Sequence, residues 1–432
     1  MRDLDGELHP VLRGLRAHEP VSWLPVLGGW LVTRRDLALR VLRDSQTFTV
    51  DDPRFSTARV VGPSMLSLDG AEHKRHRDPF AEGLRLSEVQ ARLEEFIEAE
   101  AGRLVSGFAD AGQAELRRGL AGPLAVAVVA EVLGLGDTDP RVILSWYDEI
   151  VGAVSALAGE SGQRGGQGSE SSEPGRGSGQ HRTARGSEAF GKLKESLEVV
   201  MARGEEGSLL AAVAGRGARD GGGRDRGGRD RRGRDRGRLD SGGLDRGGRD
   251  RGRLDSGEVV SNAAVLAFGG IETTEGMICN AVLQLLSHPG QLADVIADEG
   301  LAANAVEESL RLEPAAAVVD RYATADVSLG TAEIRRGDFV TVSLAGAGRD
   351  PAFFPDPDRF DVRRVNARQH LAFAHGPHFC LGAQLARLEA RAAVLALLRL
   401  PGMRLDRSRP AAARGIVFRK PPELHVRWDV SS

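Results

Sequence analysis

The sequence predicts a mainly α-helical protein with small β-sheets, built as a single large domain. Helical spacing of apolar residues runs through most of the chain, whereas the segments with strand character are short. The chain has 432 residues, 41% of them hydrophobic, which is ample for a sizeable core. Near its start, residues 21–26 and 30–33 flank Gly28 and Gly29, and this arrangement predicts a β-hairpin.

Four helices are expected next, because leucine, valine and alanine recur there at spacings of three and four residues. They span residues 35–44, 87–108, 116–133 and 141–157. The longest helical pattern comes later, at residues 258–286, with Ser256 as its predicted N-cap. Helices therefore outweigh strands in every part of the chain that has a clear period.

Two segments interrupt this pattern. Residues 159–186 are rich in glycine, serine and glutamate, and residues 219–257 repeat a Gly-Gly-Arg-Asp-Arg theme. Neither segment can bury enough apolar surface to offset its ordering entropy, so we expect both to be mobile. An RNA-binding role for the second segment is disfavoured, because aspartates offset its arginines and no aromatic residue is present for base stacking.

Composition narrows the remaining choices. The net charge is −3, and thirteen arginines against seven aspartates between residues 219 and 253 leave the rest of the chain near −9. Nucleic acid is therefore not an expected partner. The polar N-terminus predicts neither a signal peptide nor a membrane anchor. Only Cys279 and Cys380 are present, so no disulfide framework is expected and a cytoplasmic location is predicted.

One stretch near the C-terminal end, from Phe373 to Arg387, concentrates the chemical signals. Gly376 and Pro377 are unsuited to a helix, so the segment before Cys380 is expected to be a compact turn. The turn leads into an amphipathic helix whose predicted buried face is Leu381, Leu385, Leu388, Ala392 and Leu395. A cysteine at a helix entrance meets free N–H groups and the positive end of the dipole, which favour a thiolate. Such a thiolate suits an axial ligand of haem iron, although a buried, inert cysteine is equally compatible with these observations.

This stretch resembles the haem-binding loop of the cytochrome P450 family, Phe-x-x-Gly-x-x-x-Cys-x-Gly. Phe373, Gly376, Cys380 and Gly382 occupy its fixed positions, and Ala374 departs from it where most bacterial members carry glycine. The resemblance implies a single triangular, mainly α-helical domain that holds haem b (protoporphyrin IX iron). It also implies that Cys380 is the iron ligand.

The long helix at residues 258–286 carries a second set of signals. Its adjacent Gly269 and Gly270 cost roughly 1 kcal/mol each relative to alanine, so a specific requirement is expected there. That requirement is either close helix packing or a kink, or else room for dioxygen beside a haem. The stretch resembles the family's oxygen-activation motif, which implies that Glu272 is the acid and Thr273 the alcohol that deliver protons.

Haem carries two propionates, which need cationic or hydrogen-bonding partners. His73 and Arg77 lie at i and i+4, on one face of a predicted helix. Such a cluster is ordinarily solvated surface, but it resembles the family's His-x-x-x-Arg propionate pair. The resemblance implies the same role for Arg321, on a predicted strand, and for His378 in the cysteine loop.

Glu308 and Arg311 are one helical turn apart and can form an ion pair. By itself such a pair is common and contributes little, but it matches the family's Glu-x-x-Arg network beneath the thiolate side of the haem. The resemblance implies Arg359 as the third member. We assign these three residues to folding and haem retention rather than to catalysis.

By resemblance, four segments line the substrate pocket: residues 55–65, 266–273, 314–319 and 415–418. Their small and apolar side chains predict a hydrophobic, roomy site, and residues 159–186 fall in the family's lid region. The predicted pocket residues are Leu266, Gly269, Gly270, Ala316, Val318, Val319, Ile416 and Val417.

The resemblance implies a monooxygenase that inserts one oxygen atom from dioxygen into an apolar small molecule, in secondary-metabolite tailoring. A ferredoxin and its ferredoxin reductase are the expected electron donors, with NAD(P)H acting only through them, and no membrane partner is expected. One alternative keeps the haem but couples or cyclises the substrate without oxygen insertion. Another is a non-catalytic haem-binding sensor or carrier with an RNA-interacting arm.

Overall fold

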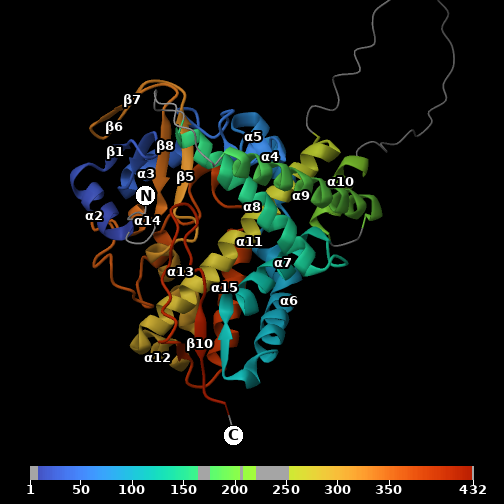
Figure 1. Cartoon of the computed structure of the whole chain (residues 1–432), viewed down its shortest axis with the longest axis vertical. Helices are drawn as coiled ribbons and strands as arrows, with labels where there is room; N and C mark the ends of the chain where they lie inside the picture. Colours follow the sequence, from blue (N-terminus) through green and yellow to red (C-terminus); the bar gives the residue numbers. More distant parts are fainter. Residues whose placement is uncertain (1–7, 164–175, 205–207, 220–252, 431–432) are drawn as a thin grey trace, which may run out of the picture.

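The computed structural model describes residues 8–163, 176–204, 208–219 and 253–430. These residues are mainly helical and contain one five-stranded, one three-stranded and one two-stranded sheet, which confirms the predicted fold class. Figure 1 shows a body that is broad where the five-stranded sheet lies and tapers toward the C-terminus. Within the described ranges, no helix has the length and apolar character needed to cross a membrane.

The first half of the chain contains short strands and helices of varied length. Its elements are α2 (Leu8–His18), β1 (Val21–Leu24), β2 (Gly29–Val32), α3 (Arg35–Arg43), β3 (Phe48–Thr49), α4 (Ser56–Val61), α5 (Gly70–Ala81), α6 (Leu86–Ser106), η1 (Ala109–Ala111), β4 (Gln113–Glu115), η2 (Arg117–Ala121), α7 (Gly122–Leu133), α8 (Pro140–Gln163), α9 (Arg176–Arg203) and α10 (Leu209–Arg219).

The second half begins with the longest helix and adds the remaining strands. Its elements are α11 (Ser256–Ser287), α12 (Pro289–Ala297), η3 (Glu299–Leu301), α13 (Ala302–Leu312), β5 (Val318–Ala323), β6 (Val327–Leu329), β7 (Ala332–Ile334), β8 (Phe339–Ser343), α14 (Leu344–Gly348), η4 (Ala367–Gln369), η5 (Gly376–His378), α15 (Ala383–Leu398), β9 (Arg404–Leu405) and β10 (His425–Arg427).

The five-stranded sheet joins strands near the N-terminus to β5 and β8 from the second half of the chain. Its strand order is β1-β2-β8-β5-β3, with the predicted hairpin confirmed as β1 paired antiparallel to β2. β2 continues in parallel to β8, and β8 pairs antiparallel with β5. Gly29 is required at this junction, because a side chain there would come within 2.6 Å of the Phe339 carbonyl oxygen.

The helical core forms where α6, α7, α11 and α15 pack together (Figure 1). Ile97, Leu124, Val282 and Ala393 are almost completely buried at this junction. The four predicted helices are confirmed, but the third has an irregular start, because η2 is a π-helical turn that precedes α7. In this turn the Gly122 N–H bonds to the Arg117 carbonyl oxygen five residues earlier, and Pro123, which has no N–H to donate, follows in the first turn of α7.

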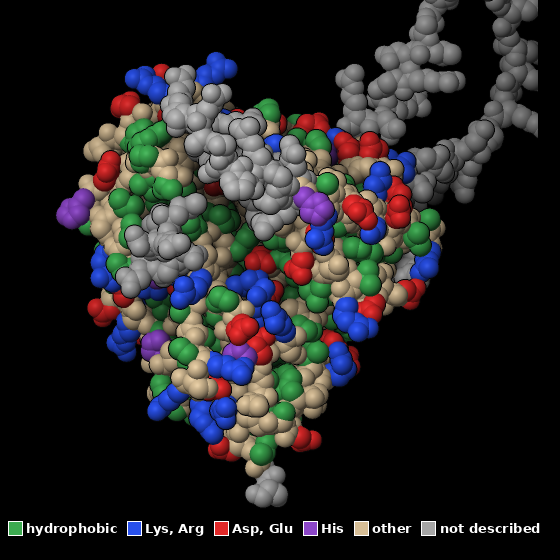
Figure 2. Space-filling view, viewed as in Figure 1, with side chains coloured by type: hydrophobic (Ala, Val, Ile, Leu, Met, Phe, Trp, Pro, Cys, Tyr) green, Lys and Arg blue, Asp and Glu red, His purple; other side chains and the backbone are tan. Residues whose placement is uncertain are grey.

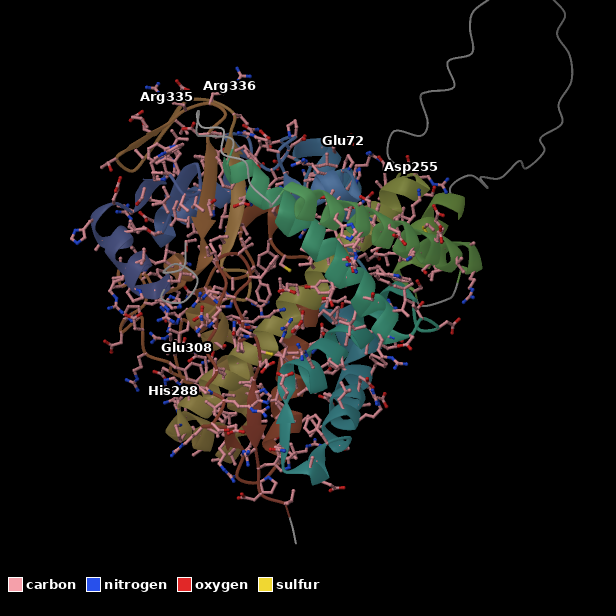
Figure 3. The ribbon with its side chains drawn as sticks, viewed as in Figure 1. Glu72, Asp255, His288, Glu308, Arg335 and Arg336 are labelled. Atoms are coloured by element: carbon pink, nitrogen blue, oxygen red, sulfur yellow. The ribbon has the colours of Figure 1, made fainter. Side chains whose placement is uncertain are left out.

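The predicted N-cap of the central helix is wrong by one residue. Asp255, not Ser256, caps α11, because its carboxylate accepts the Glu258 N–H at 2.8 Å while Glu258 accepts the Asp255 N–H at 2.9 Å. Arg75 on α5 then pairs with Glu258 at 2.5 Å, which fixes this end of α11 against α5. Asp255 and Glu72 of α5 lie at the same end of the molecule in Figure 3.

Part of the first interrupting segment, residues 159–186, and most of the second, residues 219–257, lie outside the described residues. Residues 159–163 close α8 and residues 176–186 open α9, whereas residues 164–175 are not described. Residues 220–252 are likewise outside the description, so the prediction of mobility stays a prediction. On the face seen in Figure 2, acidic and basic side chains are interspersed, as the small net charge leads one to expect.

Candidate functional site

The cysteine loop is a tight turn pressed against α3. Gly376 has φ +73°, and a side chain there would lie 2.5 Å from the Leu42 carbonyl oxygen, so only glycine fits. The Cys380 N–H donates back to the Phe373 carbonyl oxygen at 2.9 Å. The compact turn is thus confirmed, and Cys380 sits between η5 and the start of α15 with an accessible side chain.

The electrostatics of Cys380 differ from the expectation that the helix entrance favours a thiolate. Protein packed around the thiol raises its pKa, and this effect outweighs the Gly382 N–H and the charges of Arg77 and Arg387, which lower it. The thiol form is therefore favoured until a cation arrives. A bound metal ion displaces the proton from a coordinating thiol, so this environment is compatible with an iron ligand.

Ala374, the residue that departs from the family pattern, adopts a conformation that favours glycine. Its φ is +57°, in the left-handed region that costs an L-residue roughly 1–2 kcal/mol. Its neighbour Phe373 is held from the other side, where the Arg387 guanidinium lies 4.5 Å from the ring centroid. The loop therefore keeps its shape despite the missing glycine.

The two adjacent glycines of α11 answer to two different requirements. A side chain at Gly270 would come within 2.8 Å of a Val129 methyl group on α7, so this position serves close helix packing. A side chain at Gly269 would meet nothing within 4 Å. Gly270 thus faces a neighbouring helix, contrary to its predicted place in the substrate pocket, while Gly269 borders open space.

Glu272 and Thr273 follow these glycines in a polar cluster. The Thr273 hydroxyl donates to the Gly269 carbonyl oxygen at 2.6 Å. One Glu272 oxygen lies 2.8 Å from the Lys420 ammonium, and the other accepts a hydrogen bond from the Tyr147 hydroxyl. Glu272 is only 8% exposed, so these two partners replace the water that its carboxylate gives up.

The predicted propionate ligands gather beside the cysteine loop. The rings of His73 and His378 lie 4.3 Å apart, and His378 is bonded to Asp69 at 2.8 Å. Arg77 donates to the Phe379 carbonyl oxygen at 2.6 Å, and the buried Arg321 donates to the Asp320 carbonyl oxygen at 2.6 Å.

His73 is distinctive within this group. It is 3% exposed, and its Nε2 has no hydrogen-bond partner among the described residues. Burial, followed by the charges of His378 and Arg77, lowers its pKa to about 4. An unpartnered buried nitrogen carries a desolvation cost, so an added polar group at this position would be favourable.

The Glu308 network lies on α13, apart from the capped end of α11 marked by Asp255 (Figure 3). Glu308 and Arg311 are both fully buried and share two hydrogen bonds of 2.7 and 2.8 Å. The prediction that the side chain of Arg359 completes the network is wrong. The guanidinium of Arg364 lies 2.9 Å from Glu308, while Arg359 is exposed and offers only its carbonyl oxygen.

Similarity to known proteins identifies the family of this chain. The sequence profile of Cytochrome P450 matches residues 300–410. The chain is 34% identical over 422 residues to Cytochrome P450 monooxygenase PikC of Streptomyces venezuelae, covering 94% of this chain and 86% of that one. The chain belongs to the cytochrome P450 family.

Solved structures of other P450 proteins share the fold over nearly the full length. The crystal structure of CalO2 matches with a TM-score of 0.79 and 28% identity, covering 97% of this chain and 95% of that one. The post-tailoring hydroxylase HmtN, involved in himastatin biosynthesis, matches with a TM-score of 0.75 and 27% identity, covering 98% of each chain. The protein is thus a cytochrome P450 monooxygenase with the mainly helical P450 fold, and family membership implies a haem–thiolate cofactor.

The residues of this P450 fit such a cofactor. An accessible thiol stands at a glycine-rich turn, and a side chain added at Gly269 or Gly382 would meet nothing within 4 Å. The unpartnered His73 nitrogen and the buried Arg321 provide polar atoms of the kind that carboxylates bind. Haem iron needs one strong axial ligand, and Cys380 is the only thiol besides the fully buried Cys279.

Four segments expected at the substrate pocket converge in the structure. Ala316 forms an antiparallel bridge with Phe418, and the ring of Phe418 lies 5.9 Å from that of Phe268 on α11. The Met65 N–H donates to Asn262 of α11 at 2.7 Å, which brings in the segment of residues 55–65. The predicted pocket residues Leu266, Gly269, Ala316, Val318, Val319 and Ile416 are half-buried, and Val417 is 46% exposed.

Three residues that bind the buried carboxylates of Glu272 and Glu308 carry no signal in the sequence. Tyr147 and Lys420 reach Glu272 from positions more than a hundred residues away on either side, so no local spacing announces them. Arg364 is five residues beyond Arg359, and two arginines so close together are equivalent by spacing alone. Each was found only because the fold brings it to a buried carboxylate.

Proposed function

We propose that this P450 monooxygenase holds haem b through Cys380 and inserts one oxygen atom into an apolar small molecule, in secondary-metabolite tailoring. The observation that carries the proposal is an accessible thiol on a glycine turn directly beside the His73, Arg77 and His378 cluster. A thiolate ligand and propionate partners are needed on the same cofactor, and this loop offers both.

When bound, haem supplies the dioxygen chemistry, in which two electrons and two protons give one inserted oxygen atom and one water molecule. The chain's own groups do the rest. Arg77, Arg321, His73 and His378 bind the propionates and fix the orientation of the ring. Thr273 and Glu272 hold and donate protons at their hydroxyl and carboxyl oxygens, beside the open space at Gly269.

The substrate class is inferred from the converging segments. Phe268 and Phe418 pack against each other at 5.9 Å, and Tyr147 lies 6.3 Å from Phe268, so aromatic and aliphatic groups dominate this side of α11. Such walls favour apolar substrates. Tailoring of a secondary metabolite is supported by the hydroxylase HmtN, which has that role in himastatin biosynthesis.

Electrons have to arrive from another protein, and a ferredoxin with its reductase is the proposed source. Arg40 and Arg43 are exposed on α3, whose Leu42 carbonyl touches the cysteine loop at Gly376, and Phe379 beside Cys380 is 39% exposed. A basic, partly apolar face next to the thiolate suits an acidic electron carrier. A cytoplasmic location, where such carriers are reduced at the expense of NAD(P)H, belongs to the same proposal.

The decisive test is the absorption spectrum of the reduced, carbon-monoxide-treated protein. The wild-type protein is expected to show the red-shifted band of thiolate-ligated haem, and Cys380→Ser to lose it. Cys279→Ala is the matched control, because Cys279 is fully buried and burial raises the pKa of its thiol far above the usual range. A wild-type spectrum without the band, or a Cys380→Ser spectrum that keeps it, would refute the ligand assignment.

A second experiment separates oxygen insertion from its alternatives. Isotope-labelled dioxygen is supplied with the electron-transfer partners and a panel of apolar substrates, and the product is analysed by mass spectrometry. Label in the product supports monooxygenation. Product without label indicates oxidative coupling or ring closure.

A further inference from the structure

The buried carboxylate of Glu272 is bound by two side chains that neither motif of the family contains. Tyr147 comes from α8 and Lys420 from the segment between α15 and β10, and each engages a different oxygen of Glu272. The Lys420 ammonium also lies 3.2 Å from Glu275, one turn further along α11. The side chains of Lys420 and Glu272 are 11% and 10% exposed, so solvent screens this contact only weakly.

The cluster continues beyond Lys420 to the half-exposed Arg117. Arg117 forms an ion pair with Glu275 and donates to the Pro422 carbonyl oxygen at 3.0 Å. Glu275 therefore has two cations, whereas among the described residues Glu272 has one. Removing Lys420 would leave Glu275 paired with Arg117, but it would leave Glu272 with only the neutral Tyr147.

We propose that Lys420 and Tyr147 are positioning residues for proton delivery. They hold the Glu272 carboxyl group in a fixed orientation beside Thr273. The Lys420 ammonium donates hydrogen bonds and accepts none, so we assign it to orienting the acid. The inference rests on the proposed role of Glu272 in the monooxygenase reaction.

The physical argument is the cost of an unpaired buried charge. A carboxylate that loses its only cation in a poorly solvated site turns toward other partners or toward water. The carboxyl group of Glu272 then no longer has a fixed position beside Thr273. Proton delivery would slow while electrons still arrive, so reduced oxygen would leave as peroxide or water instead of entering the substrate.

The first test uses the two tyrosines of the chain, Tyr147 and Tyr322. With carbon-13 at Cζ of tyrosine, the diamagnetic reduced carbon-monoxide form of the holoenzyme is expected to give two signals, and Tyr147→Phe assigns one of them. Lys420→Met should shift the Tyr147 signal, because it removes the cation from the carboxylate that accepts the Tyr147 hydrogen bond. Lys192→Met, which removes an exposed lysine paired with Glu188, is the matched control and should shift neither signal.

The second test measures coupling, defined as product formed per NAD(P)H consumed. Lys420→Met is expected to lower coupling about tenfold and Tyr147→Phe about threefold, as for loss of a charged and a neutral hydrogen bond respectively. The solvent isotope effect should rise, while the carbon-monoxide band stays near wild type. Lys420→Arg keeps the cation and should restore most of the coupling.

Two outcomes would overturn the inference. An unshifted Tyr147 signal in Lys420→Met means that the charge of Lys420 does not reach the Tyr147–Glu272 pair. A shifted signal with unchanged coupling and isotope effect means that proton delivery does not depend on the cluster. Failure of the proposed function is distinguishable from both, because it would appear in the wild-type carbon-monoxide spectrum before any substitution is made.

Discussion

Two buried carboxylates of this P450, Glu308 and Glu272, differ in the partners that bind them. Glu308 is 0% exposed and bonds to the guanidinium groups of Arg311 and Arg364 and to the Asp361 N–H at 3.0 Å. Glu272 is 8% exposed and has one ammonium and one phenol. Rigid, bidentate pairing by arginine suits a structural role, whereas a single lysine and a hydroxyl leave an acid free to exchange its proton.

The largest expected effect follows from removing the buried ion pair between Arg311 and Glu308. Arg311→Met removes both hydrogen bonds to Glu308 and three to carbonyl oxygens, of Gly348, Pro357 and Arg359. Breaking a buried pair in this way costs about 3–5 kcal/mol, so we expect loss of folding or of haem. Chemical denaturation and the haem-to-protein ratio measure both.

Arg13→Met is the control for this substitution. It removes an ion pair with Asp358 whose side chains are 61% and 40% exposed, and such pairs contribute at most about 1 kcal/mol. If Arg311→Met unfolded at the same denaturant concentration as Arg13→Met and kept its haem, the structural role assigned to the Glu308 network would be wrong.

Substitution of Glu272 is expected to lower activity rather than stability. Glu272→Gln keeps the shape of the side chain and its contact with Tyr147, so we expect little loss of stability. General acid–base groups contribute about a hundredfold or more, so product formation should fall by roughly that factor. The measurement is product per unit time under saturating substrate and electron donor, with the melting temperature as the control. A large drop in melting temperature with normal turnover would reverse the two roles.

The third prediction separates two neighbouring arginines. Arg364→Met leaves Glu308 with one cation and removes hydrogen bonds to the carbonyl oxygens of Pro355, Asp356 and Arg359, so it should cost about 2–3 kcal/mol. Arg359→Met changes an exposed side chain and should stay within about 0.5 kcal/mol of wild type. Equal destabilisation by the two substitutions would restore the original assignment of Arg359.

These residues also show where sequence reasoning succeeds and where it ends. Gly376 and Cys380 were predictable because a turn and a helix entrance are local properties of the chain. Lys420 and Tyr147 were not, since only the packing of α8 and the C-terminal segment onto α11 brings them to Glu272. Residues far apart in sequence leave no spacing signal when they form one cluster, whereas the helices that carry them do.

The two glycines of α11 make the same point at a finer scale. A helical glycine signals that a side chain is unwelcome, but it does not say whether the reason is a neighbour or a cavity. Gly270 meets Val129 and Gly269 meets open space, and their sequence context is nearly identical. The capping residue of α11 was misplaced for a related reason, because both Asp255 and Ser256 are good N-cap residues and only the reciprocal bond with Glu258 distinguishes them.

The smallest expected effect comes from a substitution in the cysteine loop, at Ala374. Ala374 has φ +57°, so Ala374→Gly should relieve the left-handed strain and stabilise the cysteine loop by about 1 kcal/mol. Gly376→Ala, two residues away, should destabilise it, because the new methyl group would lie 2.5 Å from the Leu42 carbonyl oxygen. We assign this loop a structural role, because the bond from the Cys380 N–H to the Phe373 carbonyl oxygen closes its turn. Ala374→Gly should therefore raise the melting temperature of the holoenzyme and leave coupling unchanged. A gain in stability accompanied by a loss of coupling would mean that the loop takes part in proton delivery. The separation of structural residues from those around Glu272 would then be wrong.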